Sequence, residues 1–211
     1  MVTKTTFILL VTLLISIPTL FAEPPPEIRV QVLSGPISIT VDGLGHYLKV
    51  HSNRKEFSLG KKVNVYAGKS GLMIGGSNFG KEVRFMNPGR EYRIGERTFR
   101  GSLTVIWKNA SSLYAVTKFP LEEYISGLIN SEIQSSWPME AIKAQAIAAR
   151  TYAMKQIEAA KHTQTERTYD ITSTTLDQVY EGSHMEDNRS EIAVKATRGE
   201  LLLRNGKIFT A

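Results

Sequence analysis

The spacing of apolar residues changes at Pro120, and this change limits the possible folds more than any other feature. From residue 28 to about 118, apolar and polar residues alternate in short runs rich in β-branched side chains, at 28–32, 37–41, 63–66, 103–107 and 113–116. Alternation with a period of two indicates half-buried strands. Gly, Asn, Asp and Pro separate the runs, as turns require. The sequence therefore predicts a β-rich N-terminal part over residues 28–118.

After Pro120 the apolar residues recur every three or four positions, which indicates helices. The two expected apolar stripes are Leu121, Tyr124, Ile125, Leu128 and Ile129, and then Ile142, Ala146, Ala149, Ala153 and Ile157. Proline stands in the first turn of each helix, where its missing N–H costs nothing. Residues 188–197 favour a short helix, and 201–203 and 207–209 favour strands around an Asn205-Gly206 turn. We expect an α+β fold in which the β-rich part packs with a core of two helices plus further strands, over 119–211.

The sequences at the two ends of the chain lead to separate predictions. Lys4 precedes an apolar run of about 14 residues, which is short for a membrane span and typical of a signal peptide ending at residue 22. Leu20 fits a cleavage site poorly, so an uncleaved N-terminal anchor stays open, and either form places the body outside the cytoplasm. At the other end, an apolar strand pattern stops at Ala211, which suggests that the core is truncated.

Composition excludes several kinds of chemistry. The chain has no cysteine, which rules out thiol nucleophiles and thiolate metal sites. Its four histidines show no metal-binding spacing, so we expect no metal site and no cofactor. The net charge of +6 is spread without a basic block, which argues against nucleic acid as a partner. A membrane contact is expected only through the N-terminal segment, if it is uncleaved.

Glu132 is the strongest candidate for catalysis. It ends the apolar stripe of the first helix, where a carboxylate would lie at the edge of the core. Loss of water raises the pKa of a carboxyl group, and a Glu becomes a general acid near neutral pH in this way. The alternative is an ordinary solvated residue in the last turn of an amphipathic helix.

Two further groups are candidates for substrate binding. Arg150 lies near the alanine-rich face of the second helix, where it would bind a carboxylate or a sugar oxygen, or extend from the helix edge into water. The segment 170–180 is dense in hydroxyl and amide groups, which suit either sugar recognition or a loop that satisfies its own backbone. Its candidate residues are Thr172, Ser173, Thr174, Asp177, Gln178 and Tyr180.

Several long motifs, in order, resemble the SpoIID/LytB family. They are the run at 119–128, Ser131-Glu132-Ile133, the run at 136–153 that begins SWPMEAIKAQAIAART, and the shorter motifs at 170–174, 177–182 and 196–199. The resemblance covers residues 115–211, and more weakly the preceding strands. It implies that the essential Glu of the family's lytic transglycosylases is Glu132 and that a cleft arginine is Arg150. Some members carry Cys and zinc near the Asp-x-x-Ser-Thr segment, but this chain has Thr172 there and no Cys.

The resemblance implies a protein that acts on peptidoglycan. Its leading expected activity is cleavage of denuded glycan strands, in which one Glu gives a proton to the leaving oxygen and the sugar's own C6 hydroxyl then attacks. A rival is a non-catalytic enhancer of an N-acetylmuramoyl-L-alanine amidase, and a third is a structural partner in a sporulation or division complex.

Overall fold

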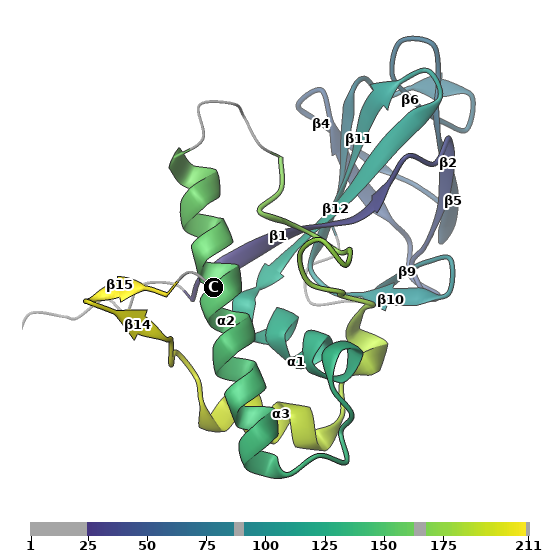
Figure 1. Cartoon of the computed structure of the whole chain (residues 1–211). Coiled ribbons are helices and arrows are strands. Elements are labelled where there is room, and N and C mark those ends of the chain that lie inside the picture. The colour runs from purple at the N-terminus through teal and green to yellow at the C-terminus, as the bar shows by residue number, and fades with distance from the viewer. Residues whose placement is uncertain (1–24, 87–90, 163–167, 210–211) are drawn as a thin grey trace, which may run out of the picture.

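The computed structural model describes residues 25–86, 91–162 and 168–209 and has an α+β fold (Figure 1). Strands fill the N-terminal part and helices the C-terminal part, which confirms the predicted fold class. Residues 1–22, expected as a signal peptide or anchor, lie outside the described residues. Within the described ranges, no helix combines the length and apolar character needed to cross a membrane.

The larger of two main sheets has the strand order β13-β1-β12-β11-β8-β3-β4. All its neighbouring strands are antiparallel except β13, which is parallel to β1. Its strands are β1 (Glu27–Ser34), β3 (Lys49–Ser52), β4 (Lys55–Ser58), β8 (Glu82–Met86), β11 (Ser102–Asn109), β12 (Ser112–Pro120) and β13 (Ile171–Thr172).

The second sheet has the order β10-β9-β2-β5-β6-β7 and packs against β11 and β12 through β5. Its strands are β2 (Ser38–Asp42), β5 (Lys62–Ala67), β6 (Leu72–Ile74), β7 (Ser77–Asn78), β9 (Tyr92–Ile94) and β10 (Arg97–Phe99). The predicted alternation is present, since Ile39 and Val41 of β2 are buried and their neighbours along the strand are not. The apolar faces of the two sheets thus form one core.

The described residues form three α-helices: α1 (Leu121–Glu132) and α3 (Asn188–Ala196) lie below the sheets in Figure 1, and the long α2 (Met139–His162) runs upward at their left. Every residue of the two predicted apolar stripes is buried. A capping box between Asp187 and Ser190 begins α3, the short helix predicted over 188–197. A 3₁₀ turn, η1 (Ser183–Met185), precedes α3, and β14 (Leu203–Arg204) and β15 (Lys207–Ile208) form the predicted hairpin.

A cluster of four buried aromatic rings joins the sheets to the helices. Phe119 at the end of β12 and Tyr124 of α1 each place their ring centroid 5.3 Å from that of Tyr180. Phe99 of β10 lies 6.2 Å from Tyr180 on the other side. Offset aromatic pairs at these distances add to the free energy of burial. We call these four residues the aromatic joint, because they come from both parts of the fold. The predicted boundary between the β-rich part and the helical core at residue 118 stays a prediction.

A substitution at Gly101 tests how tightly β12 is packed at Lys118, the residue before Phe119 of the aromatic joint. Its φ is +82°, and a Cβ atom there would lie 2.1 Å from the carbonyl oxygen of Lys118. We expect Gly101→Ala to lower the free energy of unfolding by more than about 2 kcal/mol, through backbone strain and the clash. Gly95→Ala is the control, because its φ is +62° with nothing within 4 Å of the added atom, and it should cost about 1 kcal/mol. Equal losses in urea unfolding would contradict the packing described.

Candidate functional site

Glu132 is the last residue of α1 and its side chain is exposed. The helix ends there because Ile133 adopts an extended conformation. One carboxylate oxygen, Oε1, accepts a hydrogen bond of 3.1 Å from the backbone N–H of Val179. Within the part of the chain that the structure describes, the other oxygen has no hydrogen-bond partner. Glu132 is therefore held at one oxygen and open to solvent at the other, whereas the sequence had predicted a place at the edge of the core.

The segment that holds Glu132 is itself attached to the large sheet. Asp170 accepts hydrogen bonds from the backbone N–H of Arg29 at 2.8 Å and from its guanidinium at 2.5 Å and 3.1 Å. β13 follows at once and pairs with β1. The N–H of Ser173 then donates to the carbonyl of Gln31. Strand β1 thus sets where the segment 170–180 begins.

Polar side chains of this segment are mostly engaged inside the protein. Asp177 accepts hydrogen bonds from Tyr152 at 2.7 Å and from the N–H and hydroxyl of Thr172 at 2.8 Å and 2.6 Å. Buried Gln178 accepts from Tyr124 at 3.0 Å and donates to the carbonyl of Ala149. These contacts fix the backbone on either side of Val179, which positions the N–H that binds Glu132.

Tyr180 and Ser173 close the segment upon itself. The Ser173 hydroxyl donates to the carbonyl of Tyr180 and accepts from its N–H at 3.1 Å. The Tyr180 ring is buried in the aromatic joint. Among the predicted residues of the segment, only Thr174 is exposed. The structure therefore brings Thr172, Ser173, Thr174, Asp177, Gln178 and Tyr180 together beside Glu132, but uses most of their polar groups as internal supports. Their proposed contacts with substrate stay predictions.

Gly127 is a position that the sequence reasoning missed. A Cβ atom there would lie 2.8 Å from the Tyr180 ring and 3.1 Å from the carbonyl oxygen of Gly182. Glycine inside a helix costs about 1 kcal/mol relative to alanine, so its presence in α1 was a signal of close packing. The close approach brings α1 against the segment that carries Val179, and so fixes the position of Glu132 relative to that segment.

Tyr124 connects the joint to the candidate site. Burial raises the pKa of its hydroxyl well above the ordinary value, and the charges of Asp177 and Glu132 act in the same direction. The hydroxyl therefore stays protonated and donates to Gln178.

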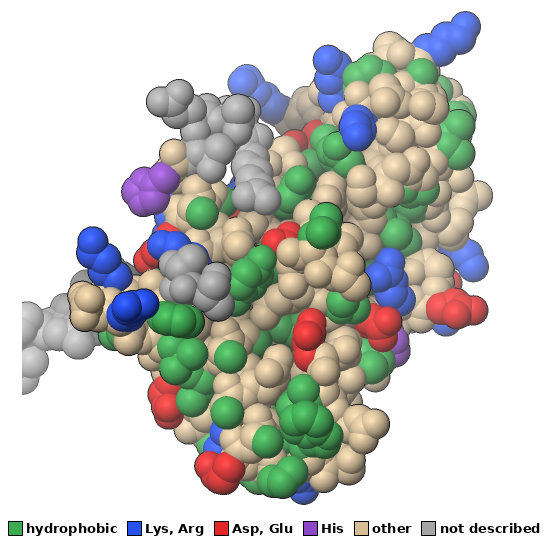
Figure 2. Space-filling view, viewed as in Figure 1, with side chains coloured by type: hydrophobic (Ala, Val, Ile, Leu, Met, Phe, Trp, Pro, Cys, Tyr) green, Lys and Arg blue, Asp and Glu red, His purple; other side chains and the backbone are tan. Residues whose placement is uncertain are grey.

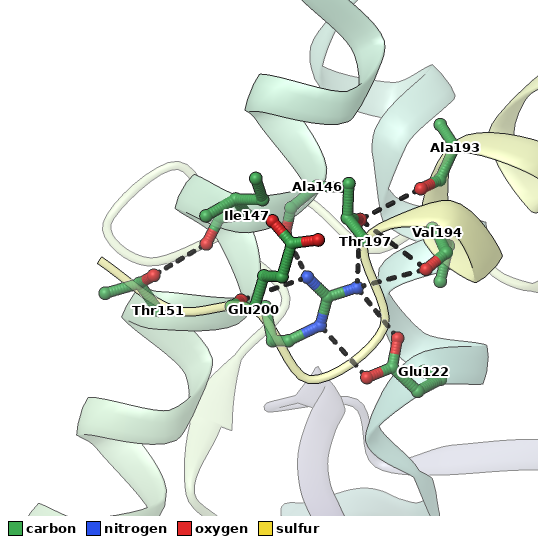
Figure 3. A network of polar contacts seen from close by, with 9 residues as sticks. Glu122, Ala146, Ile147, Thr151, Ala193, Val194, Thr197 and Glu200 are labelled. Atoms are coloured by element: carbon green, nitrogen blue, oxygen red, sulfur yellow. Dashed lines mark hydrogen bonds and ion pairs between the residues drawn. The ribbon is translucent and has the colours of Figure 1, made fainter. Parts of the chain in front are cut away.

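Arg150 requires a correction. It was expected near Glu132 in a substrate cleft, but its guanidinium is buried and binds both carboxylate oxygens of Glu122, at 3.0 Å and 2.8 Å (Figure 3). Glu122 lies ten residues before Glu132, which is about 15 Å along α1. The same guanidinium donates to the carbonyl oxygens of Val194 and Glu200. Arg150 thus links α1, α2 and the end of α3, at the opposite end of α1 from Glu132.

Trp137 lies in the turn between α1 and α2. Its side chain is 48% exposed and does not anchor the turn between α1 and α2 by burial. That turn is held by Arg189 of α3, which donates to the carbonyl oxygens of Ser135 and Trp137, each at 2.7 Å. In Figure 2, hydrophobic side chains gather at the end of the molecule where this turn passes α3. The indole is therefore presented to solvent a few residues after Glu132.

Residues that commonly bind metals do not gather near this site. In the described ranges, no three His, Asp or Glu side chains are placed to hold a metal ion. The chemistry available beside Glu132 is that of one carboxylate, one exposed indole and the hydroxyls of two threonines.

Comparison with known proteins follows the same C-terminal region. Residues 109–203 match the family model described as "Stage II sporulation protein". An uncharacterised protein of Brachyspira hyodysenteriae is 31% identical over 187 residues, which is 86% of this chain and 50% of that protein. Stage II sporulation protein D of Bacillus amyloliquefaciens is 31% identical over 133 residues, 58% of this chain and 39% of that protein.

A protein named amidase enhancer in Bacillus subtilis is 39% identical over 87 residues, 41% of this chain and 11% of that protein. The chain thus spans half the length of the Brachyspira protein and smaller shares of the other two. The family-model match includes the stretch that carries Glu132, Trp137 and Arg150.

The buried ion pair of Arg150 leads to a test of stability. Arg150→Met should lower the free energy of unfolding by about 3–5 kcal/mol, because it leaves the carboxylate of Glu122 without its partner. Lys143→Met is the control, since Lys143 pairs with Glu140, whose side chain is 83% exposed, and such a pair contributes less than about 1 kcal/mol. Urea unfolding measures both, and similar midpoints for the two variants would show that Arg150 does not link the helices.

The exposure of Trp137 leads to the opposite expectation. Trp137→Ala should change the free energy of unfolding by less than about 1 kcal/mol, because half of the side chain is already in water. Phe119→Ala, in the aromatic joint, should cost about 3–5 kcal/mol. A comparable loss in the two variants, measured by thermal unfolding, would mean that the indole is packed in solution.

Proposed function

Because this chain belongs to the SpoIID/LytB family, we propose that it is an exported protein that cleaves peptidoglycan glycan strands, with Glu132 as general acid and base. Family membership supports a role connected with the cell wall. The cleavage reaction and the export are our proposals. The observation that carries the cleavage proposal is Glu132 itself, with one carboxylate oxygen fixed by Val179 and the other open to solvent.

The proposed reaction needs only one carboxyl group. Glu132 gives its proton to the glycosidic oxygen as the bond to the anomeric carbon breaks, and the leaving sugar keeps that proton. The sugar that carries the anomeric carbon then attacks that carbon with its own C6 hydroxyl, and Glu132 takes up the hydroxyl proton, which forms a 1,6-anhydro end. Two-carboxylate glycosidases use water or a second carboxylate instead. A sugar over a carboxylate excludes water and so favours the neutral acid that the first step needs.

Neighbouring residues have separate proposed roles. Exposed Trp137 would stack on a sugar ring, since indole faces bind the apolar faces of sugars. Thr172 and Thr174 would give hydroxyl contacts. Asp177 and Gln178 are positioning residues that hold Val179, and Arg150 is a positioning residue that holds the opposite end of α1.

A second function has support of its own. A protein named amidase enhancer is 39% identical to this chain over 87 residues. In that alternative the same surface binds the glycan or an N-acetylmuramoyl-L-alanine amidase without cutting.

The test is cleavage of purified glycan strands without stem peptides, with anhydro ends detected by mass spectrometry. The full-length protein should release them, and Glu132→Gln should lower the rate by about 10²–10⁴-fold, because the amide keeps the shape but transfers no proton. Glu140→Gln, in the exposed first turn of α2, is the control and should keep the wild-type rate.

Two outcomes would redirect the proposal. If Glu132→Gln cleaves as fast as the wild type, Glu132 is not the acid. If neither protein cleaves but both raise the rate of a purified amidase equally, the enhancer function replaces the enzymatic one.

A further inference from the structure

Charge is divided unequally between the two parts of the fold. Residues 27–118 hold 15 of the 26 Lys and Arg residues but only 6 of the 20 Asp and Glu residues. Residues 119–211 hold 10 basic and 13 acidic residues, so the helical part has a slight negative charge. In Figure 2, blue side chains surround the end of the molecule formed by the sheets. The positive charge of the chain therefore lies in the β-rich part, away from Glu132.

Five exposed cations gather at the outer end of the sheets, where the turns after β3, β5 and β7 meet the end of β11 (Figure 1). Trp107 connects them: its indole donates to the carbonyl of Gly68 at 2.9 Å, and its N–H donates to the carbonyl of Lys81 at 2.8 Å. Asn53 lies against Gly80, beside Lys81. We define the basic tip as Arg54, Lys55, Lys69, Lys81 and Lys108.

No member of the basic tip forms an ion pair with another described residue. Cations elsewhere on the sheets do so, as Lys49 with Glu56 at 3.3 Å and Arg84 with Glu82 at 3.6 Å. Five unpaired like charges repel one another, and an anion bound among them relieves that repulsion. The tip therefore has the electrostatic character of an anion-binding surface.

Two of the lysines extend over aromatic rings. The Lys81 ammonium lies 5.5 Å from the ring centre of Trp107, and that of Lys108 lies 5.2 Å from the ring centre of Tyr114. Cation–π contacts restrict long side chains that would otherwise be free, so less entropy is lost when they bind a ligand. The rings thus keep at least two cations in place on the same surface.

We infer that the basic tip binds peptide-bearing strands of peptidoglycan, through the free carboxylates of their stem peptides. This inference rests on the proposed function, because it places the protein at the wall. The beginning of the described chain lies at the other end, where the N–H of Leu121 donates to the carbonyl of Pro26 at 2.9 Å. The basic tip and the beginning of the described chain therefore lie at opposite ends of the molecule. The tip would hold an intact strand while Glu132 acts on a neighbouring strand without peptides.

The experiment is co-sedimentation of the full-length protein with purified sacculi over a range of NaCl concentrations. The triple variant Lys69→Gln, Lys81→Gln, Lys108→Gln should bind at least about tenfold more weakly at low salt, and its affinity should depend less on salt than that of the wild type. The control is Lys155→Gln, Lys161→Gln, Lys207→Gln, which makes the same change in net charge on the helical part. It should bind within about twofold of the wild type. Circular dichroism checks that both variants are folded.

The other arms identify the anion. Wild-type binding should fall equally when the carboxylates of the sacculi are converted to amides, and it should be weak on glycan strands without stem peptides. Equal binding by the tip variant and the wild type, equal losses in the two triple variants, or unchanged binding to amidated sacculi would each overturn the inference. Stronger tip-dependent binding to vesicles of phosphatidylglycerol or to DNA would replace the wall with that partner.

Failure of this inference is distinct from failure of the proposed activity. Glu132→Gln should bind sacculi as the wild type does, and the tip variant should cleave denuded strands at the wild-type rate. A tip variant that lost both binding and cleavage of denuded strands would show that the tip belongs to the same site as Glu132, and would refute a separate surface.

Discussion

Close packing at the aromatic joint determines where Glu132 lies. Phe119 and Phe99 belong to the sheets, Tyr124 to α1, and Tyr180 to the segment that follows α2. The missing side chain of Gly127 lets α1 approach the Tyr180 ring. Because protein interiors are packed as densely as crystals, a change in any of these rings moves its neighbours. The N–H of Val179 is one residue from Tyr180, so the hydrogen bond to Glu132 depends on the same packing.

The elements of the fold were predictable from the sequence because each has a strong local pattern. Period-two alternation located the main strands, and the two apolar stripes located α1 and α2. Even the Asn205-Gly206 turn is present, with φ values of +53° and +74°. Short strands such as β7 and β13 have two residues each and no pattern of their own. They form because a neighbouring strand has free backbone N–H and C=O groups with which they can pair. The order of the strands in the two sheets was not predicted, because pairing between distant segments leaves no local pattern in the sequence.

The contents of the site were harder to predict, because they depend on which turns of two helices face each other. The sequence grouped Arg150 with Glu132, since both lie in one run of motifs. Periodicity gives the face of a helix but not the level at which a second helix crosses it. Here the middle of α2 meets the first turn of α1, so Arg150 pairs with Glu122. Likewise, a polar loop pattern cannot distinguish groups that bind a ligand from groups that support the backbone, and Asp177 belongs to the second kind.

The contact between Arg29 and Asp170 has a consequence for how the chain folds. The two residues are 141 positions apart, and β1 is paired on one side by β12 and on the other by β13. Such separations give a high contact order, which slows folding because the loop must close before its contacts form. While the chain is synthesised from its N-terminus, one edge of β1 stays unpaired until β12, which ends at residue 120, is present. The other edge stays unpaired until β13, which ends at residue 172, is present. During this period the strand is open to pairing with other chains. Arg29 is charged, and its side chain is still partly exposed in the folded protein. Charged residues on an unpaired strand discourage such pairing.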